Sequence, residues 1–380
     1  MKTVFFGPFL GEFGWEMFHW QGWVKKMCQG KYKDCHKIVA TYEGREPFYP
    51  QADEFWFHPQ EIKNLKISER NYIADYWYDN YPKGSGPADK NIGYYADKLL
   101  KDYQKKLPAD TIFFVPYKLN SYNYNGKNRL FGVLWLPGLA IYQNPKVLSI
   151  QGSEEQLFEV LEPTQKAKDF LAKMIDPSKK LICLFPRRRL SRRPDKNWPK
   201  EKYDLLIQRL KNKYPNYAVA ICGTPQGSYY SDKIPQDCLD LINVPDDLRF
   251  NVQVAALGQA VIALGSESGG VHASMLLEKP TLEWGFAEKE KPIKAVNFLK
   301  APLFFWPESN PSVEKIEDLV SLILEGKEIN YPQVSNSFNS YQETGNIFKL
   351  FFREVLARPV LTHFHKKNLE DGLINSPLLK

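Results

Sequence analysis

The stretch ALGSESGGVHASMLLEKPTLEWG, residues 263–285, decides the fold, because it contains two strand-like runs joined by a turn and a helix. The apolar run that ends at Leu264 leads into a turn of small residues at 265–270. The pattern over 270–277 predicts a helix, and the run at 281–284 predicts a second strand. Strands that alternate with helices in this way indicate a parallel sheet with helices on both faces.

The same alternation extends on either side of this stretch. Apolar runs that predict further strands lie at 3–6, 37–41, 112–116, 147–150, 181–185, 217–222 and 260–264. Helical spacing is found at 14–27, 94–106, 200–214 and 252–258. We therefore predict an α/β protein with a first domain at 1–165, a second at 166–330, and a C-terminal extension at 331–380 whose helix, at 347–356, packs across the domains.

Composition excludes several classes of protein. The 380 residues suggest two or three domains, and 43% hydrophobic with 25% charged residues is typical of packed cores rather than disorder. The longest apolar runs have only a few residues, far short of the roughly 20 that span a bilayer. Five cysteines without a C-x-x-C pair favour reduced thiols over a disulfide framework or a zinc site. The first residues are typical of a strand and turn rather than a signal peptide, so we expect a cytoplasmic protein.

A basic loop, FPRRRLSRRPDKNWP at 185–199, directly follows one predicted strand. Its five arginines and one lysine against one aspartate leave a net charge of +5 within 187–196. Ligands of open α/β sheets bind beyond the carboxyl ends of the strands, and guanidinium groups match phosphate oxygens. We expect a diphosphate to bind the side chains of Arg187, Arg188, Arg189, Arg192 and Lys196. A solvated basic loop is the alternative, and nucleic acid is not expected because the charge follows no helix or extended face.

The turn at 265–270 is the second candidate anion site. It also follows a predicted parallel strand, so it should open at the same edge of the sheet as the basic loop. Small residues at the start of a helix allow close approach of a phosphate to the backbone N–H groups. The expected donor-binding residues here are Glu267, Ser268, Gly269, Gly270 and His272. An ordinary serine-capped helix is the alternative for the turn, and a structural role is the alternative for His272.

The third candidate is GPFLGEFGWEMFHWQGW at 7–23, directly after the first strand. Glu12 lies at the expected start of a helix, and Glu16 and His19 follow at helical spacing on a related face. One interpretation is a general base, Glu12 with Glu16 as its rival, beside an acceptor-side His19. The alternative is that Glu12 interacts with the helix dipole while the tryptophans Trp15, Trp20 and Trp23 fill the core.

The region at 181–285 resembles the donor domain of GT-B glycosyltransferases, most closely the ADP-heptose:lipopolysaccharide heptosyltransferase group. That group has a Lys-x-Trp-Pro element after a basic loop, here 196–199, and an Asp-Ser-Gly-x-x-His element, here 267–272, before a Pro-Thr strand, here 280–281. The turn at Gly11 and Glu12 is similar to the Gly-Asp turn that holds the group's catalytic acid. Glu267 and Gly270 depart from the group's Asp and common Pro, and the arginine-rich loop is similar to that of fucosyltransferases that use GDP-fucose.

The resemblance implies two Rossmann-like domains facing each other across a cleft. It implies an inverting glycosyltransferase that moves a sugar from a nucleotide-diphosphate donor to a glycan or glycolipid acceptor. No cofactor or metal is expected, because the basic loop and the helix start would neutralise the leaving diphosphate. A peripheral membrane contact is a further expected partner. The alternatives are a non-catalytic protein that binds glycans or anions, and a nucleotide-sugar epimerase of the same architecture.

Overall fold

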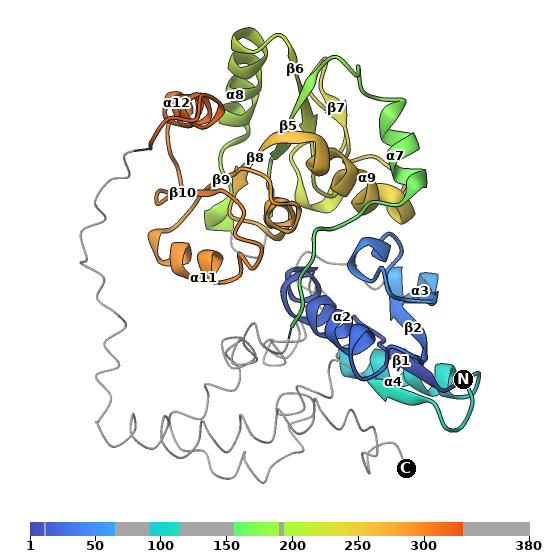
Figure 1. The fold of residues 1–380 in the computed structure, drawn as a ribbon. Helices are drawn as coiled ribbons and strands as arrows, with labels where there is room; N and C mark the ends of the chain where they lie inside the picture. The colour runs from blue at the N-terminus through green and yellow to red at the C-terminus, as the bar shows by residue number, and fades with distance from the viewer. Residues whose placement is uncertain (11–12, 65–91, 115–155, 190–193, 330–380) are drawn as a thin grey trace, which may run out of the picture. The chain divides into compact units, whose positions relative to one another are not determined.

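The computed structural model describes residues 1–10, 13–64, 92–114, 156–189 and 194–329 (Figure 1). These residues form two compact units. Unit 1 takes its described residues from Met1–Tyr42 and Gln51–Leu157, and unit 2 from Glu43–Pro50 and Phe158–Val334. The predicted extension at 331–380, with its helix at 347–356, lies outside the described residues, as does the strand predicted at 147–150.

Unit 1 contains a parallel sheet of four described strands in the order β3-β2-β1-β4. The strands are β1 (Thr3–Phe6), β2 (His36–Thr41), β3 (Glu54–Phe57) and β4 (Ile112–Phe114). The helical segments are α1 (Phe13–Trp15), a π-helical turn η1 (Glu16–Trp20), α2 (Gln21–Gln29), α3 (Gln60–Asn64) and α4 (Ile92–Gln104).

Side chains of β1 alternate between the two faces of the sheet, and a helix packs against each face. Phe6 packs against Trp23 of α2, with ring centroids 6.1 Å apart, and Phe5 packs against Tyr103 of α4 at 5.4 Å. Successive side chains of a strand point to opposite faces, so the two phenylalanines belong to two separate layers. Gly7, which follows β1, has a φ of +128° and lies so close to the Ala40 carbonyl that a Cβ would not fit there.

Unit 2 contains a parallel sheet of six described strands in the order β10-β9-β8-β5-β6-β7. The strands are β5 (Lys180–Phe185), β6 (Tyr217–Ile221), β7 (Leu239–Asp240), β8 (Ala260–Ser266), β9 (Thr281–Trp284) and β10 (Leu303–Trp306). The main helices are α7 (Gln165–Ala172), α8 (Lys200–Lys213), α9 (Asp246–Gln259), α11 (Glu290–Ala295) and α12 (Val313–Leu324).

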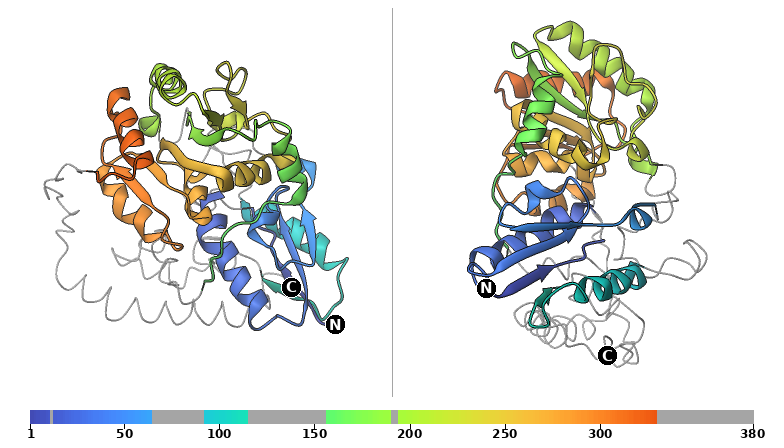
Figure 2. Two further views of the ribbon diagram at one scale, coloured as in Figure 1. Left: turned by 45° about the horizontal axis from the view of Figure 1, so that its top comes forward. Right: turned by 90° about the vertical axis from the view of Figure 1, so that its right-hand side faces the viewer.

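The helices of unit 2 lie in two pairs. In Figures 1 and 2, α12 lies beside α8, and α7 lies beside α9. One buried cluster joins Ile182, Leu184 and Leu282 of the sheet to side chains of α8 and α12, and α9 contacts β5 and β8. The prediction of two parallel α/β sheets is therefore confirmed.

A short segment of the N-terminal part of the chain, Glu43–Pro50, packs within unit 2. Asn251 of α9 donates from Nδ2 to the Gly44 carbonyl at 3.1 Å and to Glu46 Oε2 at 2.9 Å. The rings of Phe48 and Phe250 lie 4.8 Å apart. The sequence does not indicate that Glu43–Pro50 belongs to unit 2, because this placement depends on contacts with residues about 200 positions further along the chain.

Several elements differ from the sequence predictions. The helix predicted at 252–258 begins at Asp246, so the acidic pair Asp246 and Asp247 forms the start of α9. Two aromatic strands, β3 and β10, were not predicted. Each is an edge strand in the described sheets, and four residues give too short a periodic signal to separate a strand from a loop.

Candidate functional site

Three loops meet at the carboxyl edge of the sheet in unit 2. β5, β6 and β8 are parallel, so the loops that follow them emerge at one edge. The Arg188 N–H donates to the Gly227 carbonyl at 2.8 Å, which joins the loop after β5 to the loop after β6. Arg187 also forms an isolated antiparallel bridge with Ser228. The sequence prediction that the basic loop lies at this edge is confirmed.

Asn197 fixes the described part of the basic loop. Its Oδ1 accepts hydrogen bonds from the Arg187 guanidinium and from the Arg189 N–H, the latter at 3.0 Å. Its Nδ2 donates to the Arg189 carbonyl at 2.7 Å. One amide side chain therefore holds both the main chain of Arg189 and the side chain of Arg187. Sequence reasoning missed this role, although Asn197 stands inside the quoted Lys-x-Trp-Pro element.

Trp198 explains why Asn197 is held so firmly. Its ring is fully buried, it donates from Nε1 to the Pro311 carbonyl at 3.0 Å, and it packs edge-on against Tyr203 and Trp284. Trp198 thereby anchors the end of the basic loop in the core under α8 and α12.

Arg187 remains cationic at neutral pH. Burial, together with a smaller effect of the like charge of Arg189, lowers the pKa of Arg187 to about 10. A pKa of about 10 still leaves the guanidinium protonated under ordinary conditions. Arg188 is exposed and Arg189 is half-buried, while Arg192 lies outside the described residues. The loop is therefore a concentration of positive charge whose main chain is fixed at both ends.

Lys196 and Glu267 form a nearly buried ion pair. Lys196 Nζ lies 2.6 Å from Glu267 Oε1, and the two side chains are 13% and 10% exposed. The second carboxylate oxygen of Glu267 is buried and has no hydrogen-bond partner among the described residues. The structure thus brings a predicted residue of the basic loop together with a predicted residue of the turn after β8.

His272 forms a second buried pair. Its Nε2 lies 2.9 Å from Oε2 of Glu283, a carboxylate in β9 that is fully buried. Burial raises the pKa of Glu283, and the adjacent imidazole opposes that rise. Sequence reasoning identified His272 but missed Glu283. The available signal was a single acidic residue inside an otherwise apolar strand run, where charges are rare unless paired.

The turn after β8 differs from the regular helix start that was predicted. The predicted helix at 270–277 is one α-helical turn, α10 (Gly269–His272), followed by a 3-10 segment η9 (Ala273–Leu277). Ser268 precedes α10 without a side-chain capping hydrogen bond. A Cβ at Gly270 would lie 2.9 Å from the Phe185 ring, so packing alone accounts for that glycine. A single α-turn carries less dipole than a long helix, and side-chain cations supply most of the positive charge here.

The candidate catalytic residues lie in unit 1. Glu16, in η1, is 1% exposed and accepts a hydrogen bond from Thr41 Oγ1 at 2.5 Å. Glu12 lies outside the described residues, and the side chain of His19, also in η1, is not described. Trp20 and Trp23 are buried and stack with ring centroids 5.2 Å apart, which confirms the core interpretation for these two tryptophans.

Other features bear on the chemistry that this part of the chain supports. Among the described residues, no three His, Cys, Asp or Glu side chains are grouped so that they would hold a metal ion. No helix in the described ranges is long and apolar enough to cross a membrane. All five cysteines are free, and Cys183 and Cys222 are buried.

Two parallel α/β sheets, of four and six described strands, define the class of fold as that of the GT-B glycosyltransferases. A glycosyl transferase family 9 structure from Veillonella parvula has this fold, with a TM-score of 0.52 and 11% identity, over 86% of this chain and 97% of that one. Two Escherichia coli structures score lower. One is an ADP-heptose lps heptosyltransferase II, with a TM-score of 0.48 and 13% identity over 86% of this chain and 99% of that one. The other is a heptosyltransferase with ADP, with a TM-score of 0.45 and 11% identity over 85% of this chain and 100% of that one. The sequence itself matches no family model and no curated protein.

Proposed function

We propose that the chain is an inverting glycosyltransferase that transfers a sugar from a nucleotide-diphosphate donor to a glycan or glycolipid acceptor. One observation carries the proposal. The cations of a basic loop, fixed by Asn197 and Trp198, gather with His272 at the carboxyl edge of a parallel sheet in a chain with the GT-B fold. Ligands of such sheets bind at this edge, and clustered guanidinium groups suit a diphosphate.

The proposed reaction needs the diphosphate to leave and a base to act. The acceptor oxygen forms a bond to the anomeric carbon while the bond from that carbon to the diphosphate oxygen breaks, and the diphosphate keeps the electron pair. Arg187, Arg188, Arg189, Arg192 and Lys196 stabilise the charge that develops on it, so the proposal requires no metal ion. The carboxylate of Glu12 takes the proton of the acceptor hydroxyl. Glu16 is the rival base, and His19 lies on the acceptor side of the proposal.

A binding panel tests the donor site. The full chain is screened against ADP, GDP, UDP and their sugar conjugates by thermal shift, followed by calorimetry on any nucleotide that stabilises it. A ligand at 100 times its dissociation constant adds about 2.7 kcal/mol of stability. Failure of every nucleoside diphosphate to bind would contradict the proposal. Turnover of a sugar nucleotide without an acceptor would indicate an epimerase, and binding without turnover a non-catalytic binder.

Glu12→Gln tests the base. Loss of a general base costs a factor of about 100 to 10,000 in rate with little change in donor affinity. We therefore expect Glu12→Gln to bind the donor normally and to turn it over very slowly, whereas Glu16→Gln should retain more activity. A reversed pattern would assign the base to Glu16.

The proposal includes an acceptor at or near a membrane surface. Co-sedimentation of the full chain with anionic liposomes, compared with a chain that ends at residue 340, measures that contact. Loss of binding in the shorter chain would indicate that the helix predicted at 347–356 lies on the membrane surface, which is the alternative to its packing across the domains. Equal sedimentation of both chains would remove this segment from the membrane contact.

A further inference from the structure

A buried acidic residue, Glu283, lies next to His272 and has no role in the reaction described above. Its side chain is fully buried in β9, and its Oε2 lies 2.9 Å from His272 Nε2. It is paired in register with Gly265 of the neighbouring strand β8. Strand pairing therefore fixes the position of this carboxylate beside the strand that leads into the turn after β8.

Side chains of β9 alternate between the two faces of the sheet, and Glu283 lies on the face away from the apolar cluster. Leu282 and Trp284 belong to the cluster that packs under α8 and α12. Thr281 and Glu283 point to the other face, where Thr281 bonds to Ser274 at 2.5 Å and Glu283 bonds to His272. Glu283 is therefore placed by the strand on the face that also carries the turn after β8.

Burial of this carboxylate lowers the stability of the fold. Its Oε1 is buried and has no hydrogen-bond partner among the described residues. A buried charge that is only partly satisfied destabilises a protein, and an apolar residue at such a position is often neutral or stabilising. Packing alone therefore gives no reason for a glutamate at this position.

The charges that face His272 favour its protonated form on balance, because the two carboxylates among them outweigh the one ammonium group. They come from three elements: Glu283 from β9, Glu267 from the turn after β8, and Lys196 from the basic loop. Burial alone lowers the pKa of His272, but the charge and hydrogen bond of Glu283, with the charge of Glu267, outweigh burial and Lys196 and raise it above its usual value.

We propose that Glu283 is a positioning residue that keeps the imidazole of His272 oriented and positively charged, so that it adds a cation to the diphosphate site. This inference rests on the proposed function. Because the group is charged only when protonated, affinity for a nucleoside diphosphate should fall as the pH rises through the raised pKa of His272. Without Glu283 that fall should occur at lower pH.

Calorimetric titrations of the full chain with ADP, GDP and UDP between pH 5.5 and 8.5 test the inference. We expect Glu283→Gln to bind about tenfold more weakly than wild type at pH 7.5, where more of its His272 has lost the proton, and to match wild type at pH 5.5. Titration of the ligand's own phosphate is common to all variants and cancels in their ratio. Thr281→Val, which removes a buried hydrogen bond from the same strand, should keep the wild-type pH profile.

His272→Gln supplies a second measurement that does not depend on the stability of Glu283→Gln. Its affinity should be weak and should lose the extra pH dependence of the wild type. In the ligand-free chain, NMR of the six histidine rings, with His272 assigned by its absence in His272→Gln, should show that His272 titrates at lower pH in Glu283→Gln.

The two proposals fail in distinguishable ways. If Glu283→Gln binds nucleotide with an unchanged pH profile, or if His272→Gln keeps the pH dependence of the wild type, the role of Glu283 is overturned and the donor site stands. If no nucleoside diphosphate binds wild type at any pH, the proposed function fails and the role of Glu283 at a diphosphate site fails with it, even where NMR shows that the two side chains are coupled.

Discussion

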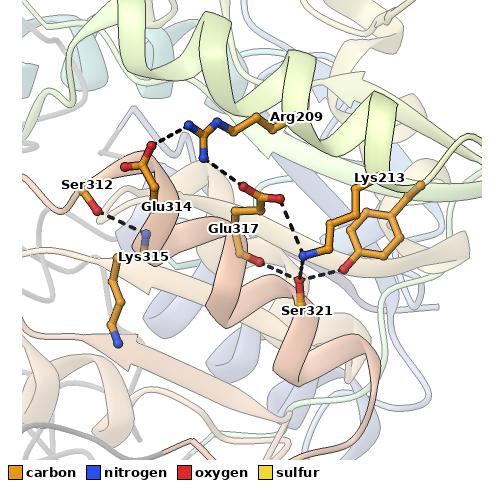
Figure 3. Close-up of polar contacts among 8 residues, drawn as sticks. Arg209, Lys213, Ser312, Glu314, Lys315, Glu317 and Ser321 are labelled. Carbon is orange, nitrogen blue, oxygen red and sulfur yellow. Dashed lines mark hydrogen bonds and ion pairs between the residues drawn. The ribbon is translucent and has the colours of Figure 1, made fainter.

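Unit 2 contains two networks of alternating charges that differ in burial and in how completely their polar atoms are paired. The edge cluster consists of Lys196, Glu267, His272 and Glu283, whose side chains are 13%, 10%, 13% and 0% exposed. The helix-pair network joins α8 to α12 (Figure 3) and consists of Arg209, Lys213, Tyr214, Glu314, Glu317 and Ser321.

The helix-pair network is more exposed than the edge cluster and is well paired. Arg209 reaches both Glu314, at 2.5 Å, and Glu317, at 3.1 Å, and its side chain is 33% exposed (Figure 3). Ser321 Oγ accepts from Lys213 and from Tyr214, both at 2.8 Å, and donates to the Glu317 carbonyl. Water screens such surface pairs, so they contribute little to stability.

The edge cluster has the opposite properties. Glu267 Oε2 and Glu283 Oε1 are buried without hydrogen-bond partners among the described residues. Partly satisfied buried charges persist mainly where they serve binding or catalysis. Both networks contain several charged groups. What distinguishes the edge cluster as a candidate site from the structural contact between α8 and α12 is that it holds buried carboxylate oxygens without hydrogen-bond partners among the described residues.

Breaking the edge cluster should have the largest effect on stability. Lys196→Met leaves Glu267 buried without its cation, and we expect a loss of about 3–5 kcal/mol in the free energy of unfolding, measured by urea denaturation. The double variant Lys196→Met with Glu267→Met should recover most of that loss but not nucleotide binding. Equal instability of the single and double variants would show that the pair does not behave as a buried ion pair.

Arg189→Ala should weaken binding of a nucleoside diphosphate by about 2–3 kcal/mol, since hydrogen bonds to charged groups are of this strength. The free energy of unfolding should fall much less than in Lys196→Met, because the main-chain hydrogen bonds of Arg189 to Asn197 remain. Calorimetry measures the affinity, and Lys168→Ala, an exposed lysine of α7, is the matched control. Unchanged affinity in Arg189→Ala and in the corresponding variants of Arg187, Arg188 and Lys196 would remove the basic loop from the site.

Ser321→Ala tests the helix-pair network at its most buried member. The substitution removes an acceptor for Lys213 and Tyr214, and we expect a loss of about 1 kcal/mol in the free energy of unfolding. Nucleotide affinity should equal that of the wild type, because Ser321 belongs to the α8–α12 contact. Reduced affinity would show that the two networks are coupled, and it would contradict the assignment of the helix-pair network to structure alone.

Arg209→Ala should have the smallest effect. Its hydrogen bond to Glu317, with the charges of Glu314 and Glu317, raises the pKa of Arg209, so the pairs favour the charged form. Because the pairs are partly exposed, we expect a small loss of stability that shrinks further in 0.5 M salt, where the Debye length is about 4 Å. Urea denaturation at two salt concentrations measures it. A large, salt-independent loss would place Arg209 with the buried pairs of the edge cluster.

Several elements of unit 2 were predictable from sequence, whereas the start of one helix and one edge strand were not. The helix at Lys200–Lys213 and the strand at Thr281–Trp284 agree with their predicted positions. The prediction of the helix now known as α9 began six residues late, because its first turn is acidic and polar. The strand Leu303–Trp306 was missed because an edge strand of four residues has no clear periodicity.

The sequence by itself determined the alternation of strands and helices, and with it the edge at which the basic loop and the small-residue turn both emerge. Tertiary structure decided which side chains pair there. Lys196 and Glu267 are 71 positions apart, and Glu283 reaches His272 because β9 pairs with β8, the strand that leads into the turn before His272. Periodicity is a local property of the chain, whereas the pairing of buried charges depends on strand register and on the space left by neighbouring side chains, which are fixed only when the sheet is assembled.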